Sequence, residues 1–275
     1  MPLAIRRRWW PAVLPPNSCG ADCSGRRADA TSELGWIDAR RPRAIIIQTF
    51  IPDAPMSLPA DHPRLMKRPF TLGELVADGV VHTLALLAGL IGFSALLYHV
   101  LARAEFGVFA ALAVYAAGFF LMFGFSLAYN MAPPSALKWM LRRFDHSAIY
   151  VMIAGTYTAI LAQFEPAPLV WALGAVVWAG AVLGVVVKLA LPGRYDRLSV
   201  ISYVALGWMG VLAIGPARAS LPEASLWLIV LGGITYVGGV AFYKWHRLRF
   251  HNAIWHLCVA VAAGLHFAAV AIAVG

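Results

Sequence analysis

The chain of 275 residues is too apolar for a water-soluble protein, because 61% of its residues are hydrophobic, only 13% are charged and the mean hydropathy is +0.72. These values exclude an ordinary soluble domain and indicate an integral membrane protein. The net charge of +9 does not indicate nucleic-acid binding, since eleven of the 22 Lys and Arg precede Thr71 and nine of the others flank apolar segments. Three cysteines, Cys19, Cys23 and Cys258, provide neither a disulfide framework nor a paired zinc motif.

Residues 1–69 differ from the rest of the chain. They are rich in Arg, Pro, Ser and Ala, and their only apolar run, 44–51, is too short to cross a bilayer. A basic stretch at 6–8 is followed by a segment broken by prolines, which argues against a cleaved signal peptide. We expect a disordered cytoplasmic extension, or else an annotation artefact upstream of a true start at Met56 or Met66.

Apolar segments of about the length that spans a bilayer follow throughout residues 70–275. They predict an all-α membrane domain of seven transmembrane helices near 76–100, 106–129, 148–164, 169–189, 198–214, 226–243 and 254–274. The fifth is the weakest of the seven, because Pro216 follows it closely.

Basic residues in alternate loops predict the orientation of these helices. Loops that face the cytoplasm carry an excess of Lys and Arg. One set of connections contains Arg64, Lys67, Arg68, Lys138, Arg142, Arg143, Lys188, Arg194, Arg197, Lys244, Arg247 and Arg249. The opposite set contains Arg103 and Arg218 together with Glu105, Glu165 and Glu223. We therefore expect a cytoplasmic amino terminus and a carboxyl terminus outside.

The first helix carries a polar stripe at its cytoplasmic end. Glu74, Asp78 and His82 are spaced four residues apart, which places them on one face of a helix. Glu74 also suits a helix start, where its charge complements the helix dipole. Ionisable groups within membrane spans are costly and usually mark a functional site, so Asp78 and His82 are candidate site residues.

Polar residues at the same depth occur on three other helices. Ser126 and Asn130 end the second helix, and Asp145 stands before the third, where it is either a site residue or an N-cap. On the seventh helix Asn252, His256 and His266 fall within an arc of about 80°, although His266 lies roughly 15 Å further along the axis than His256. His246 and His251 belong to a basic loop, where we expect them to be solvated. Convergence of the other polar residues predicts a cytoplasm-facing polar cavity.

The segment 126–158, SLAYNMAPPSALKWMLRRFDHSAIYVMIAGTYT, resembles the hemolysin III branch of the progestin and adipoQ receptor (PAQR) family. Glu74, Asp78 and His82 resemble the family's first motif, and the segment 252–266, NAIWHLCVAVAAGLH, resembles its last. The resemblance covers about 70–275. It implies seven transmembrane helices with a cytoplasmic amino terminus, in agreement with the loop charges.

This resemblance also implies a zinc site and a possible hydrolase of lipid amide or ester bonds. In the family a serine, an aspartate and three histidines surround zinc, which makes Ser126 and Asp145 the candidate catalytic residues and His256 a candidate ligand. The other two histidine positions hold Asn130 and Asn252. An amide oxygen is a poorer zinc ligand than imidazole, so the sequence predicts a weakened or absent zinc site.

Three functions remain open from the sequence. The first is membrane homeostasis or lipid sensing in a bacterial inner membrane, with membrane lipid as the partner, and we favour it because two zinc ligands are replaced. The second is a zinc-dependent membrane hydrolase. The third is a pore, as the name hemolysin suggests, although the outer halves of the helices offer few polar residues for one. Neither the substrate nor the oligomeric state follows from the sequence.

Overall fold

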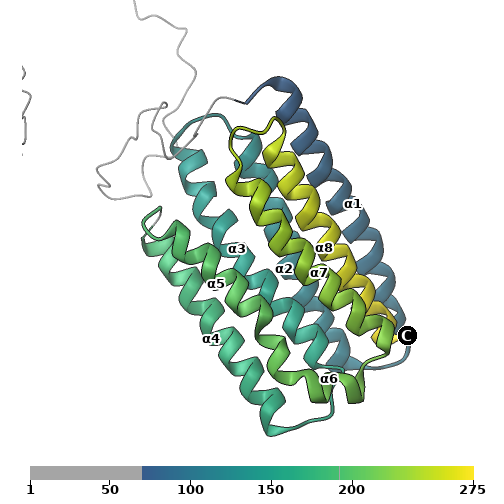
Figure 1. Ribbon diagram of the computed structural model, residues 1–275. Coiled ribbons are helices and arrows are strands. Elements are labelled where there is room, and N and C mark those ends of the chain that lie inside the picture. Colours follow the sequence, from purple (N-terminus) through teal and green to yellow (C-terminus); the bar gives the residue numbers. More distant parts are fainter. Residues whose placement is uncertain (1–69, 192) are drawn as a thin grey trace, which may run out of the picture. The chain divides into compact units, whose positions relative to one another are not determined.

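The computed structural model describes residues 70–191 and 193–275, and the extension expected over 1–69 lies outside them. The described part is helical (Figure 1). Its elements are α1 (Leu72–Ala102), α2 (Phe106–Met131), α3 (Ala136–Leu161), α4 (Pro168–Ala190), α5 (Asp196–Trp208), the short 3-10 helix η1 (Met209–Ala213), α6 (Ile214–Ser220), α7 (Glu223–Lys244) and α8 (His251–Val274).

Six helical segments in the described part are long and apolar enough to cross a membrane: α1, α2, α4, the continuous run α5–η1–α6, α7 and α8. Large apolar side chains point outward from these segments, as Ile91 on α1 and Trp171 on α4 illustrate with exposed fractions of 73% and 71%. Such surfaces are unfavourable in water but suit contact with lipid.

Helix α3 is the seventh segment, and its composition sets it apart. It is 26 residues long, but its first half contains Lys138, Arg142, Arg143 and Asp145, and it does not meet the criterion for an apolar span. The helix packs against both α2 and α4 (Figure 1). Because much of α3 packs against these two helices, it can carry polar residues that a helix facing only lipid could not.

Helix α3 also begins earlier than the sequence predicted. We expected a span from residue 148, with Asp145 as one possible N-cap, but the helix starts at Ala136 after the N-cap Ser135. Asp145 therefore lies nine residues inside the helix, and the N-cap interpretation is wrong.

The fifth helical segment, residues 196–220, changes from an α-helix to a 3-10 helix in its middle. Pro216 lacks a backbone N–H and disfavours a regular helix in the preceding turn, where the structure has the 3-10 helix η1. Tyr157 of α3 inserts its hydroxyl at this point, donating a hydrogen bond to the Gly207 carbonyl (2.9 Å) and accepting one from the Gly210 N–H (2.6 Å). These two bonds satisfy the Gly207 carbonyl and the Gly210 N–H at the break, and the segment continues to Ser220.

The helices form an up-and-down bundle closed by α8, which packs on both α7 and α1. At one end of the bundle α1, α3, α5 and α8 begin and α2, α4 and α7 end (Figure 1). We call this the basic end, because Lys138, Arg142, Lys188, Arg197 and Lys244 lie near these helix ends. Every polar residue of the candidate site except His266 is within about three turns of this end.

Two glycines bring α2 and α3 into close contact. A Cβ added at Gly118 of α2 would lie 3.1 Å from the Met152 Cα, and one added at Gly155 of α3 would lie 3.1 Å from the Tyr115 Cα. Small residues at such crossings allow membrane helices to approach closely. The pair therefore fixes the spacing of the two helices that carry Ser126 and Asp145.

Candidate functional site

Glu74, in the first turn of α1, has a structural role. Glu74 forms a capping box with the N-cap Thr71, because the Glu74 carboxylate accepts the Thr71 N–H (2.9 Å) and the Thr71 hydroxyl accepts the Glu74 N–H (3.4 Å). Its second oxygen accepts the N–H of Phe250, just before α8 (3.1 Å). Glu74 thus ties the start of α1 to the start of α8.

Asp78, one turn deeper, is the centre of a buried polar cluster. Its Oδ1 is 2.6 Å from Nδ1 of His256, and its Oδ2 accepts a hydrogen bond from the Asn252 amide (3.1 Å). Its backbone carbonyl accepts a hydrogen bond from Nδ1 of His82 (2.8 Å). Asp78 is 2% exposed and His82 is fully buried, so these contacts replace hydration that the groups lose.

Ser126 and Asn130 of α2 complete the cluster. The Asn130 amide donates to the Ser126 carbonyl (2.8 Å) and lies 3.3 Å from Ser126 Oγ, while its own oxygen accepts from Asn252 (3.1 Å). Ser126 Oγ is also 3.4 Å from Nε2 of His256. A continuous hydrogen-bonded chain therefore links α1, α2 and α8.

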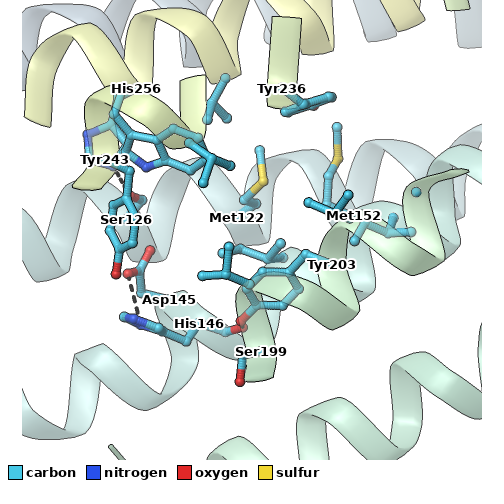
Figure 2. Close-up of a pocket in the computed structure, with 18 of the residues that line it drawn as sticks. Met122, Ser126, Asp145, His146, Met152, Ser199, Tyr203, Tyr236, Tyr243 and His256 are labelled. Carbon is cyan, nitrogen blue, oxygen red and sulfur yellow. Dashed lines mark hydrogen bonds and ion pairs between the residues drawn. The ribbon is translucent and has the colours of Figure 1, made fainter. Parts of the chain in front are cut away.

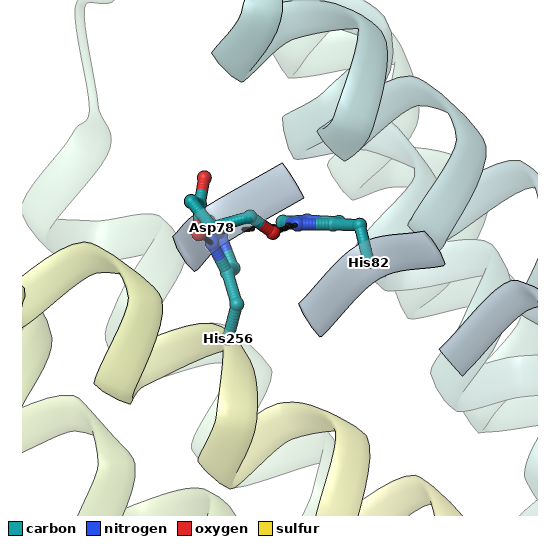
Figure 3. A group of neighbouring side chains, drawn as sticks. All are labelled: Asp78, His82 and His256. Atoms are coloured by element: carbon teal, nitrogen blue, oxygen red, sulfur yellow. Dashed lines mark hydrogen bonds and ion pairs between the residues drawn. The ribbon is translucent and has the colours of Figure 1, made fainter. Parts of the chain in front are cut away.

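Asp78, His82 and His256 are the described residues that could hold a metal ion, since each offers one ligand atom within 4.8 Å of the others (Figure 3). Both histidines, however, use Nδ1 for hydrogen bonds to Asp78. Only Nε2 of each remains for an ion, and Nε2 of His82 has no hydrogen-bond partner among the described residues.

These contacts do not fit the zinc site that the family resemblance implies. Asn130 and Asn252 occupy two positions at which that site has imidazoles, and their amide groups bond to each other and to Ser126 and Asp78. The third position, His256, is held between Asp78 and Ser126. The three residues thus form part of a hydrogen-bond network rather than a set of nitrogen ligands around one point.

A pocket of about 420 Å³ adjoins the cluster, between α2, α3, α5, α7 and α8 (Figure 2). Ser126, His256 and His82 line it at the basic end. Most of the remaining wall is apolar or aromatic, formed by residues that include Met122, Ile149, Met152, Tyr203, Tyr236 and Val259. The volume suits a small molecule or part of a lipid.

Asp145 and His146 face this pocket from α3 (Figure 2). Asp145 Oδ2 is 3.3 Å from Nδ1 of His146, and that same nitrogen donates to the Arg142 carbonyl (2.8 Å). Both side chains are mostly buried. The sequence indicated Asp145 as a site residue but gave no role to His146, which the helical register of α3 brings to the same pocket.

Two other histidines of α8 lie outside the polar cluster. His266 turns toward α7, where its Nε2 donates to the Ile229 carbonyl (3.1 Å) and its ring packs against Gly232, so it lines the pocket far from His256. His251 is the first residue of α8 and is 6% exposed. The prediction that His251 is solvated is wrong, because the helix begins three residues earlier than expected and packs its first turn against neighbours.

Some basic residues do more than mark topology. Lys138 is buried, and its ammonium donates to the carbonyls of Tyr129 and Ala132 (2.8 Å each), which caps the end of α2. Asp196 accepts from Arg142 (2.6 Å) and Lys188 (2.9 Å), joining α3, α4 and α5. The sequence located these cations at helix ends but gave no sign of their partners.

The family described as Haemolysin-III related matches residues 72–267. The chain is 34% identical over 190 residues to the Hemolysin-3 homolog of Bacillus subtilis and 31% identical over 194 residues to Hemolysin-3 of Bacillus cereus, covering 68% and 70% of this chain and 88% and 89% of those proteins.

A more distant relative is the human monocyte to macrophage differentiation factor, which is 29% identical over 127 residues, or 46% of this chain and 52% of that protein. This match supports the relationship to the PAQR family. No solved structure matches the chain. With its apolar helices and a match that runs from α1 into α8, the chain belongs to the Haemolysin-III related family of membrane proteins.

Proposed function

We propose that the chain acts in membrane homeostasis by binding a membrane lipid in the pocket beside the polar cluster. The observation that carries this proposal is the composition of the pocket wall. Polar and charged side chains, among them Ser126, Asp145 and His256, lie at the basic end, and most of the wall beyond them is apolar or aromatic. A lipid has the same division, since its headgroup and ester region are polar and its chains are apolar.

The proposed setting is a bacterial inner membrane, which the two Bacillus relatives favour. In this arrangement all seven segments cross the bilayer, α3 included, because α3 is 26 residues long and spans about 39 Å. The basic end faces the cytoplasm, since Lys and Arg gather in cytoplasmic loops. The polar cluster then lies near the inner leaflet.

Lipid binding is preferred to zinc-dependent hydrolysis because the donor set does not fit zinc. Asn130 and Asn252 bond to Ser126, to Asp78 and to each other. A lipid-binding site is compatible with these hydrogen bonds, whereas the zinc site of the family has imidazoles at these two positions. A pore is not favoured, since the pocket wall away from the basic end is mainly apolar.

Native mass spectrometry of the protein purified in mild detergent tests the proposal. We expect wild type to retain phospholipid, and we expect Val204→Trp, which places a large side chain on the α5 wall of the pocket, to lose it. The matched control is Ile201→Trp on the same helix, because Ile201 is 64% exposed and does not line the pocket.

Equal lipid retention by the two tryptophan variants would contradict binding in this pocket. A strain lacking the gene offers a second test, in which altered membrane fluidity should be restored by wild type and by Ile201→Trp but not by Val204→Trp.

A further inference from the structure

Three residues of the polar cluster form a series that crosses three helices. Asp78 Oδ1 of α1 is 2.6 Å from Nδ1 of His256 on α8, and Nε2 of the same ring is 3.4 Å from Ser126 Oγ on α2. Figure 3 shows the first pair, and Figure 2 shows Ser126 and His256 at the pocket. A carboxylate, an imidazole and a hydroxyl in this order are the parts of a serine nucleophile and its base.

The hydrogen bond to Asp78 decides which nitrogen of His256 can act as a base. A carboxylate only accepts, so Nδ1 must carry the proton in this contact. In the neutral ring the lone pair is then on Nε2, which faces the Ser126 hydroxyl. The 3.4 Å separation is longer than a tight hydrogen bond, as is common for such pairs before a substrate is bound.

From this geometry we infer that Ser126, His256 and Asp78 form a metal-independent acyl-transfer site for a carboxylic ester of a membrane lipid. Ser126 is the nucleophile, His256 is the general base, and Asp78 is a positioning residue that holds the imidazole in the required tautomer. The inference rests on the proposed function, because the substrate is a lipid bound in the adjoining pocket.

The two asparagines support these roles. Asn252 donates to Asp78 Oδ2 (3.1 Å), which leaves Oδ1 for His256 and fixes the plane of the carboxylate. The two N–H groups of the Asn130 amide are directed at the Ser126 carbonyl (2.8 Å) and at Ser126 Oγ (3.3 Å), which orients the hydroxyl. Replacing zinc ligands by amides at positions 130 and 252 therefore fits hydroxyl chemistry at this site.

Burial and the pocket give the series access to a substrate while limiting water. Ser126 is 6% exposed, Asp78 is 2% exposed, and both Ser126 and His256 line the pocket. Charges and dipoles act more strongly in such a site than in water. The apolar wall formed by Met122, Met152 and Val259 can hold the acyl chain next to the hydroxyl.

The reaction is balanced without any other reactant than water. Ser126 Oγ attacks the ester carbonyl carbon while its proton passes to Nε2 of His256, and the same proton leaves with the alcohol when the ester C–O bond breaks. A water then attacks the acyl-serine, gives one proton to His256 and releases the carboxylic acid. The proton returns to Ser126 Oγ, so that ester and water yield acid and alcohol.

A fluorophosphonate carrying an alkyl chain tests this assignment on full-length protein in detergent. The serine oxygen attacks phosphorus, fluoride leaves, and the serine proton leaves with it through His256. We expect labelling of wild type, mapped to Ser126 by peptide mass spectrometry and unchanged by EDTA. Ser126→Ala should abolish it, and His256→Gln and Asp78→Asn should slow it by about 100-fold or more.

Ser225→Ala is the matched control, because Ser225 is a buried serine that does not line the pocket and donates to the Ala269 carbonyl (2.9 Å). It should label like wild type. If a variant does not fold, mapping the labelled residue in wild type is sufficient to test whether Ser126 is the nucleophile. Folded wild type in which Ser126 is not labelled would overturn the inference. Labelling that persists in folded His256→Gln, or that requires added zinc, also overturns it. Lipid retention by an unlabelled wild type would leave the proposed function standing.

Discussion

Replacing Gly155 by alanine should weaken the contact between α2 and α3. The added Cβ would lie 3.1 Å from both the Tyr115 Cα and the Val114 carbonyl oxygen. These are backbone atoms of a helix, so no side-chain rotation can relieve the contact and the two helices must separate. Overpacking of this kind costs about 1–3 kcal/mol.

Alanine also favours a helix by about 1 kcal/mol relative to glycine, which partly hides that cost. Gly124→Ala on α2 isolates the contact, because a Cβ at Gly124 meets no atom within 4 Å. The midpoint of thermal unfolding in detergent, followed by tryptophan fluorescence, should be lower for Gly155→Ala than for Gly124→Ala by about 2–12 °C. Equal midpoints for the two variants would refute the reasoning that these backbones are in contact.

Two further predictions concern the metal and the topology. Introducing Asn130→His together with Asn252→His should create a zinc site with His256, since three imidazoles are a common zinc ligand set, and metal analysis of purified protein should find near-stoichiometric zinc in the double variant and much less in wild type. This expectation would be contradicted if wild type contained stoichiometric zinc and His256→Ala lost it. If the basic end is cytoplasmic, green fluorescent protein fused after Arg249 should fluoresce and alkaline phosphatase fused after Gly275 should be active. The reverse pattern would show that the basic end faces away from the cytoplasm.

Helix positions were largely predictable from the sequence. Apolar runs of about twenty residues predicted each helical segment, and most observed boundaries differ from the expected ones by four residues or fewer. The larger differences are the end of the fifth segment, expected at residue 214 but observed at Ser220, and the start of α3, whose first three turns are polar. Hydropathy recognises segments with an apolar surface, whereas much of the surface of α3 packs against α2 and α4.

The sequence predicted how far along the bundle the candidate site residues lie, but not which residues they bond to. Spacing on α1 and α8 indicated that Asp78, His82, Asn252 and His256 lie near the basic end. The same spacing placed His266 on one face with His256, yet His266 bonds to α7 while His256 bonds to α1. An arc of about 80° on a helix can face two different neighbours, so periodicity alone cannot choose between them.

The sequence by itself determined that this chain is a helical membrane protein of the Haemolysin-III related family, because composition, apolar run length and local motifs are properties of consecutive residues. Only the tertiary structure decided that Asp78, His256 and Ser126 form one series and that Asn130 and Asn252 bond to it. These residues are separated by as many as 178 positions in the chain. Their contacts depend on how α1, α2 and α8 pack, which no local pattern encodes.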